Sequence, residues 1–200
     1  METPEQVLVV PRSLLFSGGE IPQGLIRDGL NDLVERIGRN YRFVDRPRAE
    51  DDPSLKQIIP YSYLSWDDKV FLLRRLATQT EVRLHDKLSI GVGGHINPGD
   101  PETGSILEGG ALRELHEEID VRSTFRLHLE AFLNDESNSV GQVHFGIVYR
   151  VALEGGDVEV REKDLMEGRF VPLSDLLSYK DRMETWSSIL TDHLLAHRPS

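Results

Sequence analysis

Arg113-Glu114-Leu115-His116-Glu117-Glu118 lies near the middle of this 200-residue chain and follows the glycine pair Gly93-Gly94. We expect the six residues to form part of a helix, in which positions three and four apart share one face. Three of its acids have that spacing, and like charges so close repel one another by roughly a few tenths of a kcal/mol per pair. A hard divalent cation such as Mg²⁺ or Mn²⁺ binds carboxylate oxygens and would offset this repulsion. The spacing therefore predicts a metal site on the helix.

The same residues resemble the core of the Nudix box. That family pattern reads Gly, five residues of any kind, Glu, seven of any kind, and then Arg-Glu-aliphatic-any-Glu-Glu-any-Gly-aliphatic. The positions that match it are Arg113, Glu114, Leu115, Glu117, Glu118 and Val121. Two positions depart from it, because Ser105 stands where the family has its first Glu and Asp120 stands where it has Gly. Ser105 instead fits the N-cap of a helix, with Glu108 at the third helical position of a capping box.

Two glycines compete for the first position of the box. Gly99 has the literal spacing, whereas Gly94 follows the apolar stretch 88–92, which reads as a strand. We prefer Gly94, because a strand leading into Gly-Gly is similar to the family arrangement. This choice implies a loop five residues longer than the usual one, which carries 97–102.

The resemblance implies a fold, an activity and a set of site residues. The fold is an α/β class Nudix-type α/β/α sandwich with a mixed sheet. The activity is hydrolysis of a phosphoanhydride bond in a nucleoside diphosphate derivative, with Mg²⁺ or Mn²⁺ as cofactor. The implied metal ligands are Gly94, through its carbonyl oxygen, and Glu114, Glu117 and Glu118; the catalytic residues are Arg113, Glu117 and Glu118; the substrate-binding residues are Gly93, His95 and Glu162.

Several of these roles have alternatives. Arg113 is similar to the family's orienting arginine, but it also has the spacing of an ordinary ion pair with Glu117. In the family that this chain resembles, a further acid from a loop after the box commonly completes metal binding or serves as the base. The candidates here are Glu162, Asp164 and Glu167, of which we favour Glu162. A lone histidine such as His95 is often simply packed or hydrogen-bonded.

Alternatives also exist for the activity. The three acids on one face are also compatible with a solvated helix surface. The departures at Ser105 and Asp120 raise the possibility of a Nudix-like module that senses a nucleotide without turnover. The isopentenyl diphosphate isomerase branch of the same fold uses a catalytic cysteine, and this chain contains none.

Composition excludes other classes. A formal net charge of -11 argues against a general nucleic-acid or membrane binder, since phosphate backbones select basic surfaces. Without cysteine there is no disulfide framework, thiolate zinc site or thiol nucleophile. The first residues lack the features of a signal peptide, and no apolar run reaches about 18 residues, so we expect a cytoplasmic protein. We expect its partner to be a small-molecule nucleoside diphosphate derivative. The sequence does not decide between a monomer and a homodimer.

The pattern of apolar residues predicts a single domain over 1–200, with 1–55 as an N-terminal extension packed on it. The expected strands are 6–11, 58–65, 69–75, 88–92, 142–151, 157–160 and 170–173, the expected helix of the extension is 23–39, and 46–56 is expected to be a loop.

Overall fold

The computed structural model describes residues 4–16, 19, 21–76, 87–101 and 104–197. Glu102, at the end of the predicted long loop, lies outside them. The chain divides into two compact units, each built from separate segments. Unit 1 comprises Met1–Tyr61, Gly93–Arg113 and Glu130–Val148, and unit 2 comprises Ser62–Val92, Glu114–Leu129 and Tyr149–Ser200.

Unit 1 is organised around an antiparallel arrangement of the N-terminal strand. The elements that lie wholly within it are β1 (Gln6–Pro11), α1 (Arg12–Leu15), β2 (Gly24–Ile26), α2 (Leu30–Asn40), β3 (Arg42–Asp45), α3 (Arg46–Asp51) and α5 (Ser139–Val143). β1 pairs with β3 on one side, and Val9 faces Gln57 of β4 on the other. Val7, Val9, Val44, Ala49 and Leu55 form a buried cluster. The β-branched run of β1 thus becomes a core strand of this unit.

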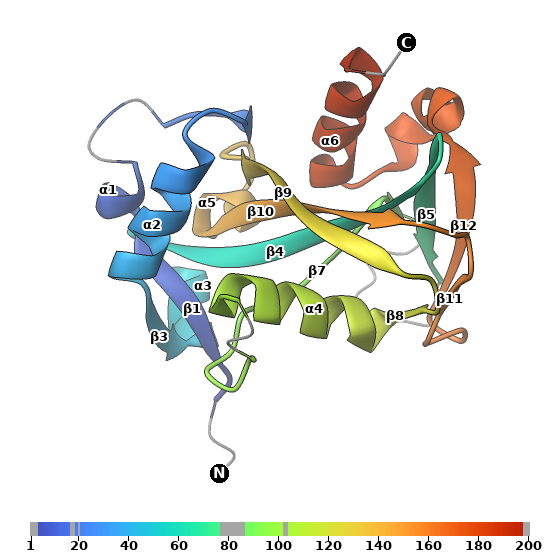
Figure 1. Cartoon of the computed structure of the whole chain (residues 1–200). Coiled ribbons are helices and arrows are strands. Elements are labelled where there is room, and N and C mark those ends of the chain that lie inside the picture. Colours follow the sequence, from blue (N-terminus) through green and yellow to red (C-terminus); the bar gives the residue numbers. More distant parts are fainter. Residues whose placement is uncertain (1–3, 17–18, 20, 77–86, 102–103, 198–200) are drawn as a thin grey trace. The chain divides into compact units, whose positions relative to one another are not determined.

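Unit 2 contains the turn and the second strand of the predicted hairpin. The elements that lie wholly within it are β5 (Lys69–Arg75), β6 (Leu88–Ser89), β8 (Ile119–Val121), β11 (Val158–Val160), β12 (Met166–Pro172), the 3₁₀ helix η2 (Leu173–Arg182) and α6 (Thr185–Ala196). β12 runs antiparallel alongside β5, as Figure 1 shows, and Phe170 faces Phe71. β8 and β11 form a separate two-stranded sheet, in which Asp120 faces Glu159.

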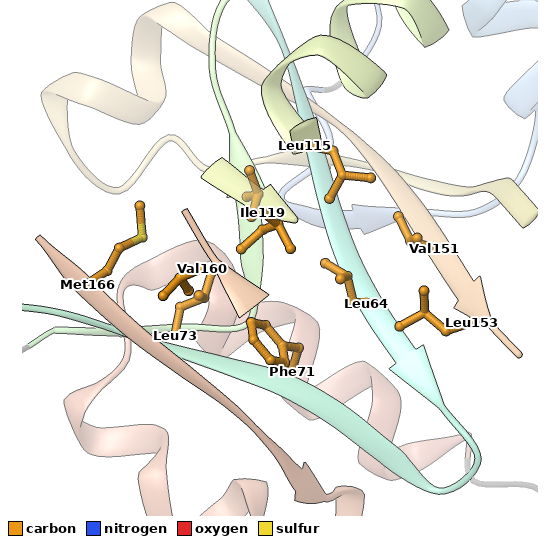
Figure 2. Packing of buried hydrophobic residues seen from close by; sticks show 10 residues of the cluster. Leu64, Phe71, Leu73, Leu115, Ile119, Val151, Leu153, Val160 and Met166 are labelled. Atoms are coloured by element: carbon orange, nitrogen blue, oxygen red, sulfur yellow. The ribbon is translucent and has the colours of Figure 1, made fainter. Parts of the chain in front are cut away.

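The core of unit 2 gathers apolar side chains from the hairpin, the end of a helix and the later strands. Its buried members are Leu64, Phe71, Leu73, Val92, Leu115, Ile119, Val151, Leu153, Val160 and Met166. Figure 2 shows Leu115 and Ile119 directed into the same cluster as Phe71 and Leu73 of β5. This burial determines which face of the helix remains for the acids.

Five elements contribute residues to both units. They are β4 (Leu55–Trp66), β7 (Gly91–Gly93), α4 (Ile106–Glu118), β9 (Phe125–Asn134) and β10 (His144–Leu153). Within α4 the boundary falls between Arg113 and Glu114. Among the described residues, no helix is both long enough and apolar enough to cross a membrane.

Two expectations for the N-terminal segment are wrong. Residues 23–39 form β2, a turn and α2 instead of one helix, because Gly24 and Gly29 have φ of +88° and +66°, which a right-handed helix excludes. Residues 46–51 form α3 instead of a loop. Pro47 lies in its first turn, where a missing N–H breaks no helical hydrogen bond.

Two strands differ from the prediction. The expected strand 88–92 is interrupted at Ile90, whose N–H donates to Ser187 Oγ at 2.9 Å. The expected strand 142–151 begins at His144, because the preceding residues form α5. Its first six residues are all buried, so they do not alternate between buried and exposed. The hairpin strands, β1 and β11 agree with the prediction to within a few residues. The expected strand 170–173 corresponds to β12, which begins earlier, at Met166, and ends at Pro172.

A glycine in α4 has a packing role that can be tested. A Cβ on Gly109 would lie 1.6 Å from the carbonyl oxygen of Pro101, a backbone atom that cannot move aside easily. We expect Gly109→Ala to lower the free energy of unfolding by about 1–3 kcal/mol, as overpacking does. Gly38 of α2 is the matched control, because a Cβ there meets nothing within 4 Å. Gly38→Ala should be neutral or stabilising by up to about 1 kcal/mol. Urea denaturation of both variants measures this, and equal stabilities would contradict the close approach.

Candidate active site

The end of α4 separates apolar and acidic side chains. Leu115 is 1% exposed and Ile119 is fully buried, so this side of the helix faces the core of unit 2. Glu114 and Glu118 are partly buried and Glu117 is exposed. Because the glutamates are spaced by three and four residues, they share the remaining face. The predicted grouping of the three acids is therefore present within this unit.

Glu118 has the most perturbed environment of the group. Burial raises the pKa of Glu118 to about 7; Arg75 opposes the rise, and the charges of Glu114, Glu162 and Glu117 add to it. Arg75 Nη2 lies 4.0 Å from Glu118 Oε1, and the Glu118 side chain is 21% exposed. Among the described residues, Arg75 offsets only part of this rise, because the net shift of the Glu118 pKa is upward. The site therefore has a local excess of negative charge in a partly desolvated position.

These residues suit a hard divalent cation. Carboxylate oxygens are the ligands that Mg²⁺ and Mn²⁺ prefer, and such an ion would add positive charge beside Glu118. Glu114, Glu117 and Glu118 could hold it. Gly94 belongs to unit 1 and stays a prediction from the sequence alone.

The later loop brings Glu162 to this group. Arg161 N donates to the carbonyl oxygen of Glu118 at 2.8 Å, which ties the loop to the end of α4. Glu162 is exposed, and its charge acts on Glu118. Glu167, by contrast, pairs with Arg74 at 2.9 Å. Glu162 therefore stays our choice for the acid of the later loop.

Arg113 lies in unit 1 and holds the loop that follows Gly94. Its guanidinium donates to the carbonyl oxygen of His95 at 2.6 Å and to Asn97 Oδ1 at 3.2 Å. It also forms an ion pair with Asp100, whose side chain is 2% exposed. Charge-assisted hydrogen bonds to a buried carboxylate are strong and directional. Arg113 therefore fixes the path of the chain immediately after the Gly-Gly pair.

Asp100 is a residue that the sequence analysis missed. Its Oδ2 accepts from Asn97 N at 2.9 Å, and its own N–H donates to Asn97 O at 3.1 Å, so it closes a tight turn. An Asn-Pro-Gly-Asp sequence is a turn signal. That signal indicates the turn but not the arginine that binds it.

A close approach of the backbone explains why Gly93, the first glycine of the pair, has no side chain. A Cβ on Gly93 would lie 2.7 Å from the carbonyl oxygen of Pro60, which is closer than real Cβ atoms approach. Any side chain at this position would displace β7 from its neighbour. The close approach places Gly94 and His95 at the end of that strand.

His95 differs from a cationic phosphate ligand. Its Nε2 lies 2.9 Å from Gln57 Oε1. Burial, together with the nearby charges of Arg46 and His144, lowers the pKa of His95 to about 4. The imidazole is therefore neutral at neutral pH, so contact with a phosphate would rely on hydrogen bonding instead of charge.

The two departures from the box have structural explanations. Ser105 Oγ accepts from Glu108 N at 3.2 Å, which is the N-cap contact that the sequence predicts. Asp120 lies in β8 and pairs with Arg122 at 2.9 Å and with Arg161 at 3.5 Å. Asp67 is the one non-glycine residue with positive φ in the described part of the chain, so position 120 does not require glycine. Neither departure removes one of the three acids of α4.

A cavity in unit 2 lies apart from the carboxylates of α4 in its lining residues. A cavity of about 300 Å³ in unit 2 is lined by residues that include Arg74, Arg169 and Arg182. The described residues around it include none of the carboxylates of α4. The chemistry of the acids, and not this cavity, therefore identifies the candidate site.

Comparison with known proteins assigns the family. The NUDIX domain family model matches residues 63–194, which is more than half of the chain. Protein YmaB of Bacillus subtilis (strain 168) is 37% identical over 200 residues, covering 95% of this chain and 97% of YmaB. The chain belongs to the Nudix family and is a Nudix-type pyrophosphohydrolase.

Solved structures confirm the predicted fold. The crystal structure of Tm1382, which is grouped with the Nudix hydrolases, has a TM-score of 0.83 at 30% identity and covers 96% of this chain and 99% of its own. The NUDIX domain of Shewanella oneidensis NrtR, complexed with ADP ribose, has a TM-score of 0.52 at 17% identity, covering 71% of this chain and 89% of its own. The Nudix-type α/β/α sandwich with a mixed sheet is therefore confirmed.

Proposed function

We propose that this protein is a hydrolase dependent on Mg²⁺ or Mn²⁺ that cleaves a phosphoanhydride bond in a nucleoside diphosphate derivative. The observation that carries the proposal is the environment of Glu118, where burial and three neighbouring acids raise the pKa to about 7. A folded protein retains such a repulsive arrangement at a functional site when a ligand compensates for it. The ligand with matching charge and hardness is a divalent cation.

The residues of unit 2 divide the chemistry among them. Glu114, Glu117 and Glu118 would hold the cation. When bound, the cation would neutralise phosphate oxygens and lower the pKa of a coordinated water. Glu117 or Glu118 would also accept the proton of the attacking water, since a carboxylate within hydrogen-bonding distance serves as a general base. Glu162, on the loop tied to the end of α4, would contact the substrate.

The residues of unit 1 position the backbone of the loop. Arg113 binds the carbonyl oxygen of His95 and thereby orients the peptide units that follow Gly93 and Gly94. We propose that Gly94 adds its carbonyl oxygen to the metal and that Gly93 and His95 contact the substrate. In the absence of a bound metal ion, His95 would do so as a neutral hydrogen-bonding group.

A sensor without turnover is the rival function, and the departures at Ser105 and Asp120 motivate it. Ser105 caps α4 and Asp120 forms ion pairs, so both residues have roles that are compatible with activity. Retention of Glu114, Glu117 and Glu118 favours hydrolysis.

The direct test is a substrate panel with and without metal. Nucleotide sugars, ADP-ribose, dinucleoside polyphosphates and nucleoside triphosphates would each be incubated with Mg²⁺, with Mn²⁺ and with EDTA. We expect two phosphorylated products from at least one nucleoside diphosphate derivative, formed with metal and lost with EDTA. Binding of such a compound without any product, at both metals and across the pH range, would support the sensor instead.

A further inference from the structure

A second group of metal-ligating side chains lies in unit 1. Glu50, His95 and His144 each offer one ligand atom, and these three atoms lie within 4.8 Å of one another. Glu50 comes from α3, His95 from the loop after β7, and His144 is the first residue of β10. α3 also contacts α5, which directly precedes His144 (Figure 1). Segments far apart in the sequence thus converge on one group of donors.

Hydrogen bonds orient both imidazoles. His144 Nδ1 lies 2.7 Å from the carbonyl oxygen of Val140, so it donates and leaves Nε2 with a free lone pair. His95 Nε2 lies 2.9 Å from Gln57 Oε1, which leaves Nδ1 in the same state. Metal-ligating histidines typically donate their other N–H to a carbonyl or carboxylate in this way. The two rings lie with centroids 5.7 Å apart.

The surroundings contain an unsatisfied polar atom. Gln57 is fully buried, and its amide nitrogen has no hydrogen-bond partner among the described residues. It belongs to the amide group whose oxygen contacts His95. A buried donor of this kind is costly unless it meets an acceptor such as a water or an anion. Glu50 is exposed, which gives solvent ions access to the group.

We propose that Glu50, His95 and His144 bind a borderline transition-metal ion, with Zn²⁺ as the expected occupant. Imidazole nitrogen suits Zn²⁺, whereas the all-oxygen set of Glu114, Glu117 and Glu118 suits Mg²⁺ or Mn²⁺. Two histidines and one glutamate form a three-ligand zinc site with one open position. Water or an oxyanion would fill that position.

The geometry requires only a small adjustment. Tetrahedral Zn²⁺ with ligands at about 2.0–2.1 Å brings ligand atoms to roughly 3.4 Å from one another. The exposed Glu50 side chain can rotate to close the remaining distance. Arg46 Nε lies 3.4 Å from Glu50 Oε1, but both side chains are exposed, so this weak ion pair does not hold the carboxylate in place.

The test is titration of the metal-free full chain with Zn²⁺ in excess Mg²⁺, which occupies oxygen-only sites. We expect one tightly bound equivalent by calorimetry and a rise in melting temperature. Glu50→Gln and His144→Gln should each weaken binding at least about tenfold. Because Glu50 is exposed, Glu50→Gln should fold normally, and circular dichroism would verify this. Co²⁺ in place of Zn²⁺ should give a visible spectrum that Glu50→Gln changes.

A histidine pair elsewhere provides the control. His193 and His197 of the C-terminal segment lie with ring centroids 4.3 Å apart and could also capture Zn²⁺. The double variant His193→Gln/His197→Gln should retain the bound equivalent. Absence of tight Zn²⁺ uptake by the wild-type chain would overturn the proposal. So would uptake that the double variant abolishes and Glu50→Gln leaves unchanged.

Discussion

Glu118→Gln is expected to lower turnover of the best substrate by at least ~100-fold in saturating Mg²⁺ or Mn²⁺. The substitution keeps the size of the side chain but removes the negative charge that would bind the cation. A hundredfold loss corresponds to about 2.7 kcal/mol of transition-state stabilisation. Steady-state kinetics over a range of metal concentrations measures this loss. A shift in the metal requirement alone would assign Glu118 to binding and not to the chemical step.

The metal-free protein gives an independent readout of the same residue. The pKa of Glu118 is raised from 4.5 to about 7 in the folded protein, so ionisation of this residue opposes folding. This cost is absent below the unfolded value of 4.5 and complete above about 7. In EDTA at pH 8, Glu118→Gln should therefore be more stable than wild type, by about 3 kcal/mol at most. At pH 4 the two should have equal stability. Urea denaturation at both pH values measures the difference.

Glu108→Gln is the matched control for this variant. Glu108 lies in the first turn of the same helix and is exposed. Glutamine also fits the third position of a capping box, so the cap at Ser105 is preserved. The charge change is the same, and we expect turnover within about twofold of wild type. Unchanged turnover in Glu118→Gln as well would remove Glu118 from the mechanism.

The acidic helix was predictable because local spacing determines it. Residues 113–118 specify which side chains share a face, and Leu115 and Ile119 are buried as an amphipathic helix requires. The N-cap at Ser105 follows from the same local logic. The family resemblance supplied the fold as a whole.

Other features depend on contacts that sequence spacing does not reveal. The sequence around Gly29 fits a helix, but its φ of +66° lies outside the range of a right-handed helix. Asp100 reads as a turn residue, and only the folded chain brings Arg113 to it. Glu50, His95 and His144 lie far apart in the sequence, and none belongs to a motif. Their proximity arises from tertiary packing of unit 1.

A buried lysine supports this part of unit 1. Lys56 is fully buried, and its ammonium donates to Glu136 Oε1 at 2.7 Å, to the carbonyl oxygen of Gly141 at 2.8 Å and to that of His144 at 3.2 Å. Arg12 binds the other oxygen of Glu136 at 2.7 Å. Burial lowers the pKa of Lys56, because the favourable contact with Glu136 offsets only part of the desolvation.

Glu136→Gln should therefore lower the free energy of unfolding by about 3 kcal/mol, since it removes the carboxylate that the buried ammonium contacts at 2.7 Å. Burial alone would raise the pKa of Glu136, but hydrogen bonds from Lys56 and Arg12 lower it below its usual 4.5. Its contribution is thus present above pH 4.5 and is lost as the pH falls through the lowered value. Denaturation at pH 7 and at pH 3 should show the difference between wild type and variant shrinking in acid.

The exposed pair of Glu35 and Arg39 on α2 separates this effect from simple loss of charge. Their side chains are 57% and 73% exposed, and Glu35→Gln should change stability by less than about 0.5 kcal/mol.

The double variant Lys56→Met/Glu136→Gln removes the buried ammonium as well and should recover most of the loss. Because Lys56 also binds the carbonyl oxygen of His144, Glu136→Gln should weaken Zn²⁺ binding without touching a ligand. Equal losses in Glu35→Gln and Glu136→Gln would show that the Lys56–Glu136 pair contributes no more than an exposed ion pair.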